Sequence, residues 1–172
     1  SDREAPAGML WPDWDAPLAF LPVEGEELLS PDGASKENSV EASWVVKILM
    51  GLIEEGGLEI SSIGIITPYA GQVRAIRDMI PESMQDVEVR TVDGYQGREK
   101  DVIIFSSVRS NPDGNVGFLS DRRRLNVALT RSRRGLIVVG NPETLRHDDN
   151  WRAWIDHIRS SKLEAWHLLG TA

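Results

Sequence analysis

Three segments of this sequence are apolar at almost every position, and each has the length of a single β-strand. They cover residues 63–67, 102–108 and 136–140, and the second is rich in β-branched side chains. A strand with water on one face alternates apolar and polar residues, so continuous apolar runs are typical of parallel strands buried on both faces. Weaker patterns at 18–23 and 87–92 predict two further strands.

The segments that separate these strands have the spacing of amphipathic helices. The predicted helices cover residues 38–55, 71–80, 122–133 and 142–160. The first begins with an Asn-x-x-Glu pattern at Asn38 that resembles a capping box, and Gly56 and Gly57 end it. Strands that alternate with helices predict an α/β fold, in which a parallel β-sheet is sandwiched between α-helices.

The chain is long enough for one domain with its own core, since it has 172 residues and 41% hydrophobic content. We expect this domain to span residues 18–160. Residues 1–17 hold prolines and two tryptophans without a period, and they are either an irregular linker or the truncated end of a larger protein. Residues 161–172 are expected to form a tail. No apolar run approaches the ~20 residues that cross a bilayer, so we expect no membrane partner.

The net charge of −8 at first argues against a polyanionic partner. The acidity is local, however, because residues 1–60 carry three basic and 13 acidic groups, whereas residues 61–140 carry 12 basic and nine acidic groups. The basic groups of the second segment are almost all arginines, which suit bidentate contact with phosphate. The acidic stretch 24–41 either faces a partner or is a solvated loop.

The absence of cysteine and the spacing of the histidines argue against metal binding. The chain has no cysteine, which excludes disulfides and thiolate metal sites and fits a reducing intracellular compartment, cytoplasm or nucleus. His147, His157 and His167 lie ten residues apart, without the carboxylates or spacing of a metal site. We expect no metal to be held by this chain.

Polar residues follow the predicted strands at the points where the strands end. In parallel sheets, ligands bind at the carboxyl ends of the strands. Here those ends are 68–69, 91–96, 109–111 and 140–141. We therefore expect a binding surface along one edge of the sheet.

Several motifs in this region carry a family resemblance. They are Thr-Val-Asp-Gly-Tyr-Gln-Gly-Arg-Glu-Lys-Asp (91–101), Val-Arg-Ser-Asn (108–111), Val-Gly-Phe-Leu (116–119) and Arg-Arg-Leu-Asn-Val-Ala-Leu-Thr-Arg (123–131). They resemble motifs V and VI of superfamily 1 helicases, in the group that contains the helicase of nonsense-mediated mRNA decay, senataxin and the immunoglobulin-mu-binding helicase. The resemblance extends through Ile-Ile-Thr-Pro-Tyr-Ala-Gly-Gln (65–72) and the Asn-x-x-Glu-Ala at 38–42, and covers about residues 18–146.

The resemblance implies the second, C-terminal RecA-like domain of such a helicase. ATP would lie in a cleft between this domain and a first RecA-like domain of the same protein, which would supply the phosphate loop G-x-x-x-x-G-K-S/T and the Asp-Glu pair for Mg²⁺. In this chain no glycine is followed by lysine, and no Asp-Glu dipeptide occurs. We therefore expect the chain alone to hold neither ATP nor metal and to be inactive as an ATP hydrolase.

The resemblance also implies nucleotide-site residues. Arg131 matches the arginine finger, which adds positive charge to the transferring phosphoryl group; from spacing alone it is one more solvated arginine on a helix face. Arg124 lies seven residues earlier on nearly the same predicted face, and it either supports the phosphates or ion-pairs with an acidic neighbour. Gly97 is expected near the γ-phosphate, because a close backbone approach leaves no room for a Cβ.

Two side chains of motif V have less certain roles. Glu99 is expected near the nucleotide as a ribose or water ligand or as the group that orients an arginine, and otherwise as a surface carboxylate. Gln96 is expected to order a water molecule or to couple the nucleotide to the bound strand.

The strand ends are expected to bind single-stranded RNA or DNA without reading its sequence. The residues expected to do so are Pro68, Tyr69, Thr91, Arg109 and Asn111. For Tyr69, a packed ring at the end of a strand is as plausible as a ring that stacks on a base.

Three functions fit these observations. The leading one is the C-terminal motor domain of an ATP-dependent helicase or translocase. The alternatives are a non-catalytic binding module for nucleic acid or protein with a RecA-like fold, and a degenerate domain that makes only protein contacts.

Overall fold

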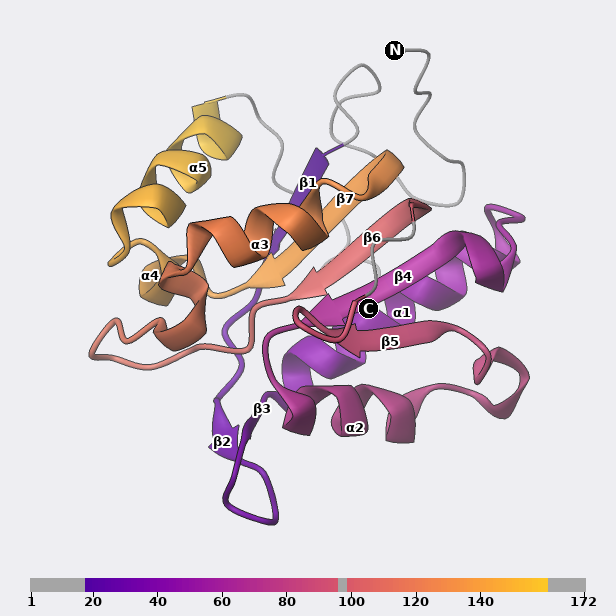
Figure 1. Cartoon of the computed structure of the whole chain (residues 1–172), viewed down its shortest axis with the longest axis horizontal. Coiled ribbons are helices and arrows are strands. Elements are labelled where there is room, and N and C mark those ends of the chain that lie inside the picture. Colours follow the sequence, from indigo (N-terminus) through magenta and orange to yellow (C-terminus); the bar gives the residue numbers. More distant parts are fainter. Residues whose placement is uncertain (1–17, 96–98, 161–172) are drawn as a thin grey trace.

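The computed structural model describes residues 18–95 and 99–160, and its centre is a five-stranded sheet. The strands are β1 (Leu18–Pro22), β4 (Ile63–Thr67), β5 (Glu88–Thr91), β6 (Lys100–Ser106) and β7 (Ser132–Gly140). They lie in the order β1-β7-β6-β4-β5, and every neighbouring pair is parallel (Figure 1). The α/β fold with a parallel sheet is therefore confirmed, and it is consistent with a RecA-like domain.

Helices cover both faces of this sheet. One face carries α1 (Ser39–Glu54) and α2 (Ala70–Met79); the other carries α3 (Arg122–Leu129), α4 (Pro142–Leu145) and α5 (Asp149–Ser160) (Figure 1). Alternate strand residues enter different cores: Ile104 packs in the cluster with α1 and α2, whereas Ile103 and Phe105 pack in the cluster with α3 and α5. Burial on both faces explains the continuous apolar runs of the sequence. Among the described helices, none has the length and apolar character needed to cross a membrane.

Short elements complete the fold. A hairpin of β2 (Leu28–Leu29) and β3 (Lys36–Glu37) projects from the domain within a segment predicted to be a loop (Figure 1). One-turn 3-10 helices cover Ile60–Ser62, Glu82–Met84 and Gly117–Ser120.

The prediction of a helix over residues 122–133 is wrong at its carboxyl end. The helix ends at Leu129, and Thr130 closes it with a hydrogen bond from its hydroxyl to the carbonyl of Asn126. The backbone of Arg131 then accepts a hydrogen bond from Lys100, and Ser132 pairs with Lys100 in the sheet. Pairing with β6 thus replaces helical hydrogen bonds from Arg131 onward, so Arg131 lies in the connection between α3 and β7.

Other predicted bounds shift in smaller ways. The predicted strand 102–108 runs instead from Lys100 to Ser106. The predicted helix 142–160 is two helices, because a turn after Leu145 precedes α5, whose first turn is capped by the Asp148 carboxylate through the amide of Trp151.

Candidate functional site

The two edges of the sheet carry different sets of the predicted residues. At the amino ends of β6 and β7, the backbone N–H of Lys100 donates to the carbonyl of Arg131 over 3.0 Å. Beside them, Arg133 Nε donates to Glu99 Oε2 over 3.0 Å, in a pair that is half-exposed. The fold therefore brings Glu99 and Arg131 to one place. Gln96 and Gly97, which the sequence assigns to the same site, lie outside the described residues.

The side chain of Arg131 is half-buried, and its Nε is a buried donor without a hydrogen-bond partner in the described part of the chain. The nearby phenol of Tyr95 is buried, and burial together with the charge of Glu88 raises its pKa to about 12 against the opposing effect of Arg131. A buried N–H donor without an acceptor is costly, so the Nε of Arg131 is left able to donate to an acceptor that the described residues do not supply.

Metal coordination has no comparable support. Within residues 18–95 and 99–160, no three side chains of the types His, Cys, Asp and Glu gather as a metal site would require.

Arg124 lies apart from Arg131. It is in the first turn of α3, where its Nε contacts Asp93 Oδ1 at 3.0 Å and Asp121 Oδ2 at 3.8 Å. Its guanidinium carbon is 6.0 Å from the ring centroid of Phe118. Because Arg131 lies beyond the end of the helix, the two arginines do not share a helical face. The sequence left open whether Arg124 supports the phosphates or ion-pairs with an acidic neighbour, and the structure shows the ion pairs.

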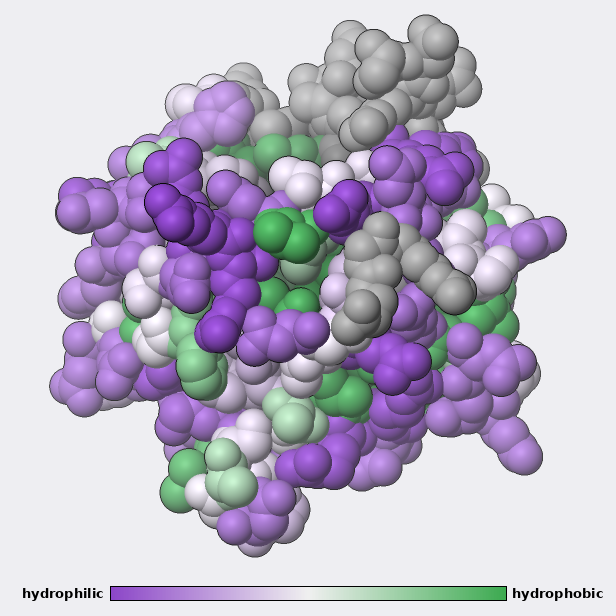
Figure 2. All heavy atoms as spheres, in the orientation of Figure 1, coloured by the Kyte–Doolittle hydropathy of each residue, from purple (hydrophilic) through white to green (hydrophobic). Residues whose placement is uncertain are grey.

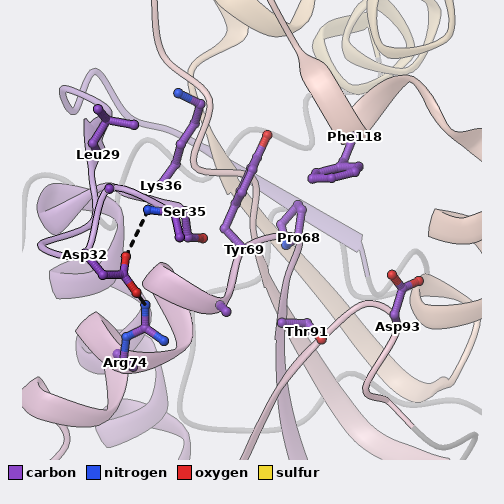
Figure 3. Close-up of a pocket in the computed structure, with 13 residues that line it drawn as sticks. Leu29, Asp32, Ser35, Lys36, Pro68, Tyr69, Arg74, Thr91, Asp93 and Phe118 are labelled. Carbon is purple, nitrogen blue, oxygen red and sulfur yellow. Dashed lines mark hydrogen bonds and ion pairs between the residues drawn. The ribbon is translucent and has the colours of Figure 1, made fainter.

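The carboxyl edge holds a groove of about 420 Å³. Three of the predicted nucleic-acid residues line it, namely Pro68, Tyr69 and Thr91 (Figure 3). The remaining wall comes from the β2–β3 hairpin, from the start of α2 and from Phe118. Sequence reasoning assigned no role to the hairpin, because two-residue strands leave no periodic signal.

Arg109 and Asn111 point into the protein rather than into this groove. Arg109 is 6% exposed; its Nε lies 3.2 Å from both carboxylate oxygens of Glu27, and its Nη1 donates to the hydroxyl of Tyr69 over 3.1 Å. Asn111 Nδ2 and the backbone N–H of Ser110 also donate to Glu27 Oε1. Burial opposes ionisation of Glu27, but these hydrogen bonds prevail and lower its pKa. The carboxylate thus organises the loop after β6.

A second buried carboxylate, Glu41, supports the same loop. Its Oε1 accepts hydrogen bonds from the Ser106 hydroxyl over 2.8 Å and from the Val108 N–H over 2.9 Å. Asn38 caps α1 as predicted, by accepting from the N–H of Glu41, but the reciprocal half of a capping box is absent because the Asn38 N–H donates to Gln72 instead. Glu41 therefore joins the loop to the helix start, since its Oε2 also accepts a hydrogen bond from Asn38 Nδ2 over 3.3 Å.

Val108 shows what this support achieves. It has φ 71°, a left-handed conformation that β-branched residues rarely adopt. Asn38 Nδ2 donates to its carbonyl over 3.0 Å, so both backbone polar groups of Val108 are held by buried side chains. This forced turn directs Arg109 towards Glu27 and Tyr69.

Comparison with known proteins agrees with the motifs at both edges. A family model described as an AAA domain matches residues 1–143. Regulator of nonsense transcripts 1 of Dictyostelium discoideum is 42% identical over 170 residues, which are 95% of this chain and 13% of that protein. The ATP-dependent helicase NAM7 of Saccharomyces cerevisiae is 41% identical over 160 residues, which are 87% of this chain and 16% of that protein.

The chain belongs to the AAA domain family. Within it, the chain is a domain of superfamily 1 helicase type, in the group of the helicase of nonsense-mediated mRNA decay, as the motifs indicated. The ATP-dependent helicase upf1 of Schizosaccharomyces pombe has the same relation, at 42% identity over 160 residues. This helicase domain spans about one seventh of the length of the relatives it matches.

Two residues of the helicase domain escaped sequence reasoning. Glu27 lies in an acidic stretch that reads as a solvated loop, and only the three-dimensional fold brings it beside Arg109, 82 positions later. Phe118 lies within a quoted motif, but its 55% exposure follows from the turn that carries it and not from the residue type.

Proposed function

We propose that this chain is the C-terminal motor domain of an ATP-dependent helicase or translocase that acts on single-stranded RNA or DNA. The observation that carries the proposal is the guanidinium of Arg131, a half-buried cation at the amino edge of the sheet whose Nε has no partner among the described residues. The relatives called ATP-dependent helicases support it.

In this proposal the nucleotide site is shared with a first RecA-like domain of the same protein. That domain would hold ATP and Mg²⁺ through a phosphate loop and an Asp-Glu pair, neither of which this sequence contains. Arg131 would place positive charge on the γ-phosphoryl oxygens when the two domains close, which is worth ~10³–10⁵ in rate for arginine fingers. Gly97 would approach the γ-phosphate, and Gln96 would order a water molecule or couple the nucleotide to the bound strand.

Glu99 would act through an arginine in this site. Its carboxylate is held by Arg133, two residues from Arg131, and a carboxylate beside phosphates is repelled unless a cation compensates it. We propose that Glu99 orients the arginine-rich start of β7, next to Arg131. Arg124 would support the phosphates only after its ion pairs with Asp93 and Asp121 open.

The strand would bind at the opposite edge, in the groove lined by Pro68, Tyr69 and Thr91. Arg109 and Asn111 would fix the shape of this groove through Glu27 and Tyr69 rather than contact phosphates. The nucleotide and the strand would then bind at opposite edges of the same sheet, and domain closure on ATP would change how tightly the strand is held.

The non-catalytic alternative accounts for the groove but not for Arg131, because a pure binding module has no need of a half-buried arginine at the other edge whose Nε lacks a hydrogen-bond partner among the described residues. The names of the relatives refer to transcripts, so action inside the cell, in the cytoplasm or the nucleus, is part of the proposal.

The isolated chain tests the division of labour between the two domains. We expect ATP turnover at the background level and weak binding of a fluorescein-labelled single strand, measured by anisotropy. The binding should weaken further between about 50 and 200 mM salt, since counterions are released from the phosphates. Turnover that co-purifies with the chain would contradict the shared site, and no binding at low salt would contradict the strand-binding edge.

A further inference from the structure

Phe118 is a large aromatic ring that the fold keeps at the surface. It is 55% exposed, whereas its neighbours Val116 and Leu119 are buried at 9% and 1%. The backbone of the turn is fixed on both sides: Trp151 Nε1 donates to the Leu119 carbonyl over 2.8 Å, and the N–H of Gly117 donates to the Asn115 side chain over 3.2 Å. The exposure of the ring is therefore a property of an anchored turn.

The ring stands at the mouth of the groove on the carboxyl edge. Its centroid is 5.6 Å from that of Tyr69, and the two rings are tilted by 55°. It lines the groove together with Pro68 and Thr91, and Figure 3 shows it beside Pro68 and Tyr69. Tyr69 is held by Arg109 and is 7% exposed, so Phe118 is the more accessible of the two rings.

The charged side chains of the groove already have partners. Asp32 contacts Arg74 at 3.4 Å, Lys36 contacts Glu27 at 3.6 Å, and Asp93 contacts Arg124 at 3.0 Å. Paired charges attract a polyanion only weakly. Beside these paired charges and the polar side chains of Ser35 and Thr91, the groove offers a ligand the apolar surfaces of Pro68, Phe118 and the exposed Leu29.

Exposed arginines follow Phe118 in the chain, at the start of α3. Figure 2 shows strongly hydrophilic side chains over α3, which carries the exposed arginines Arg122 and Arg123. The guanidinium carbon of the next residue, Arg124, is 6.0 Å from the centroid of the Phe118 ring. Phosphates can bind such arginines while bases turn toward an aromatic ring, which is how single strands are bound without sequence preference.

We propose that Phe118 is a stacking platform for one nucleobase of the single strand in this groove. The inference rests on the proposed function and adds a residue and a mode of contact to it. The base stacks on the flat face of the Phe118 ring, and Pro68 gives an apolar surface beside that base. Tyr69 packs against the Phe118 ring and fixes its position. Any base can stack, so the contact adds affinity and register without specificity.

The test compares two fluorescein-labelled oligomers of equal length and charge with the 172-residue chain. One is an oligouridylate and the other is its abasic counterpart, and the dissociation constant of each is measured by anisotropy at low salt. The variants are Phe118→Leu, which keeps apolar bulk without an aromatic face, and Phe118→Trp, which keeps the face. Val127→Ala is the matched control, because Val127 is also 55% exposed and does not line the groove.

We expect the wild-type chain to prefer the oligouridylate, and Phe118→Leu to weaken binding of that oligomer about 5- to 100-fold, the effect of losing one stacked base. Phe118→Trp and Val127→Ala should keep the preference. A preference that survives Phe118→Leu would overturn the platform, as would equal loss for both oligomers, the result expected of a ring that shapes a phosphate or protein contact. If the wild type binds neither oligomer, the strand-binding function itself fails, and the platform fails with it.

Discussion

Glu41 is the single residue on which the geometry after β6 most depends. Its carboxylate is fully buried and accepts hydrogen bonds from Ser106 and Val108, two residues that bracket the end of the strand. Burial raises its pKa from 4.5 to about 8, against the opposing effect of these donors. A titratable group inside the domain thus holds the strained turn at Val108.

This burial predicts a pH dependence of stability. The folded-state pKa lies above the ordinary value, so the stabilising contribution is complete below about pH 4.5 and is lost as the pH rises through about 8. We expect the free energy of unfolding to fall by up to ~1.4 kcal/mol per pH unit within this window. Urea midpoints of the wild type and of Glu41→Gln, measured between about pH 5 and pH 8, test this.

Glu41→Gln is the informative variant because its amide oxygen can still accept from Ser106 and Val108, while its charge no longer changes with pH. Its midpoint should be much less sensitive to pH than that of the wild type. Parallel curves for the two proteins would show that another group titrates.

For single residues, the sequence predicted which of them lie at the strand ends better than it predicted which side chains they contact. Tyr69 and Thr91 line the groove at the carboxyl edge, because their places at the strand ends do not depend on the neighbouring loops. The inward direction of Arg109 and Asn111 could not be predicted, since it depends on Glu27, which reaches them only through long-range folding.

Among the elements, the junction of α3 and β7 shows why helix bounds are hard to predict. The sequence of the arginine-rich segment 131–134 is compatible with a continued helix. Pairing with strand β6 makes the chain extended there instead. Arg133 and Arg134 there contact Glu99 and Asp101 across the two strands. The same effect places Arg131 between two elements, where a finger can project.

The 3-10 helix Gly117–Ser120 is the element that presents Phe118, and Gly117 sets its start. Gly117 has φ 53°, and a Cβ there would collide with Arg109 Nη1 and the Tyr69 hydroxyl. Gly33 in the hairpin has a similar φ of 72°, but a Cβ there meets no atom within 4 Å. An alanine at Gly33 would thus meet backbone strain alone, whereas an alanine at Gly117 would meet both backbone strain and a collision.

We expect Gly33→Ala to lower the free energy of unfolding by about 1–2 kcal/mol, the cost of a left-handed alanine. Gly117→Ala should cost about 1–3 kcal/mol more, because the added methyl group overpacks the Arg109–Tyr69 contact. Urea denaturation followed by circular dichroism measures both variants. Equal losses would mean that Arg109 and Tyr69 move aside without cost.

For the whole molecule, the sheet keeps two kinds of candidate site apart. Glu99 and Arg131 lie where β6 and β7 begin, and the groove with Pro68, Tyr69 and Thr91 lies where β4 and β5 end. Alternation of strands and helices predicted the parallel sheet and the carboxyl-edge groove. The amino-edge site could not be predicted in this way, because it depends on the pairing of β6 with β7, which brings Lys100 beside Arg131 and Ser132.

The central claim is that this domain supplies an arginine finger to a nucleotide held mainly by another domain. The most direct measurement is the ATP turnover of a protein that contains this domain together with a first RecA-like domain. We expect Arg131→Ala to lower turnover by about 10³-fold or more, with single-strand binding nearly unchanged. Arg152→Ala, which removes an exposed arginine of α5 that pairs with Asp149, serves as the control and should leave turnover nearly unchanged. Normal turnover in Arg131→Ala would contradict the account.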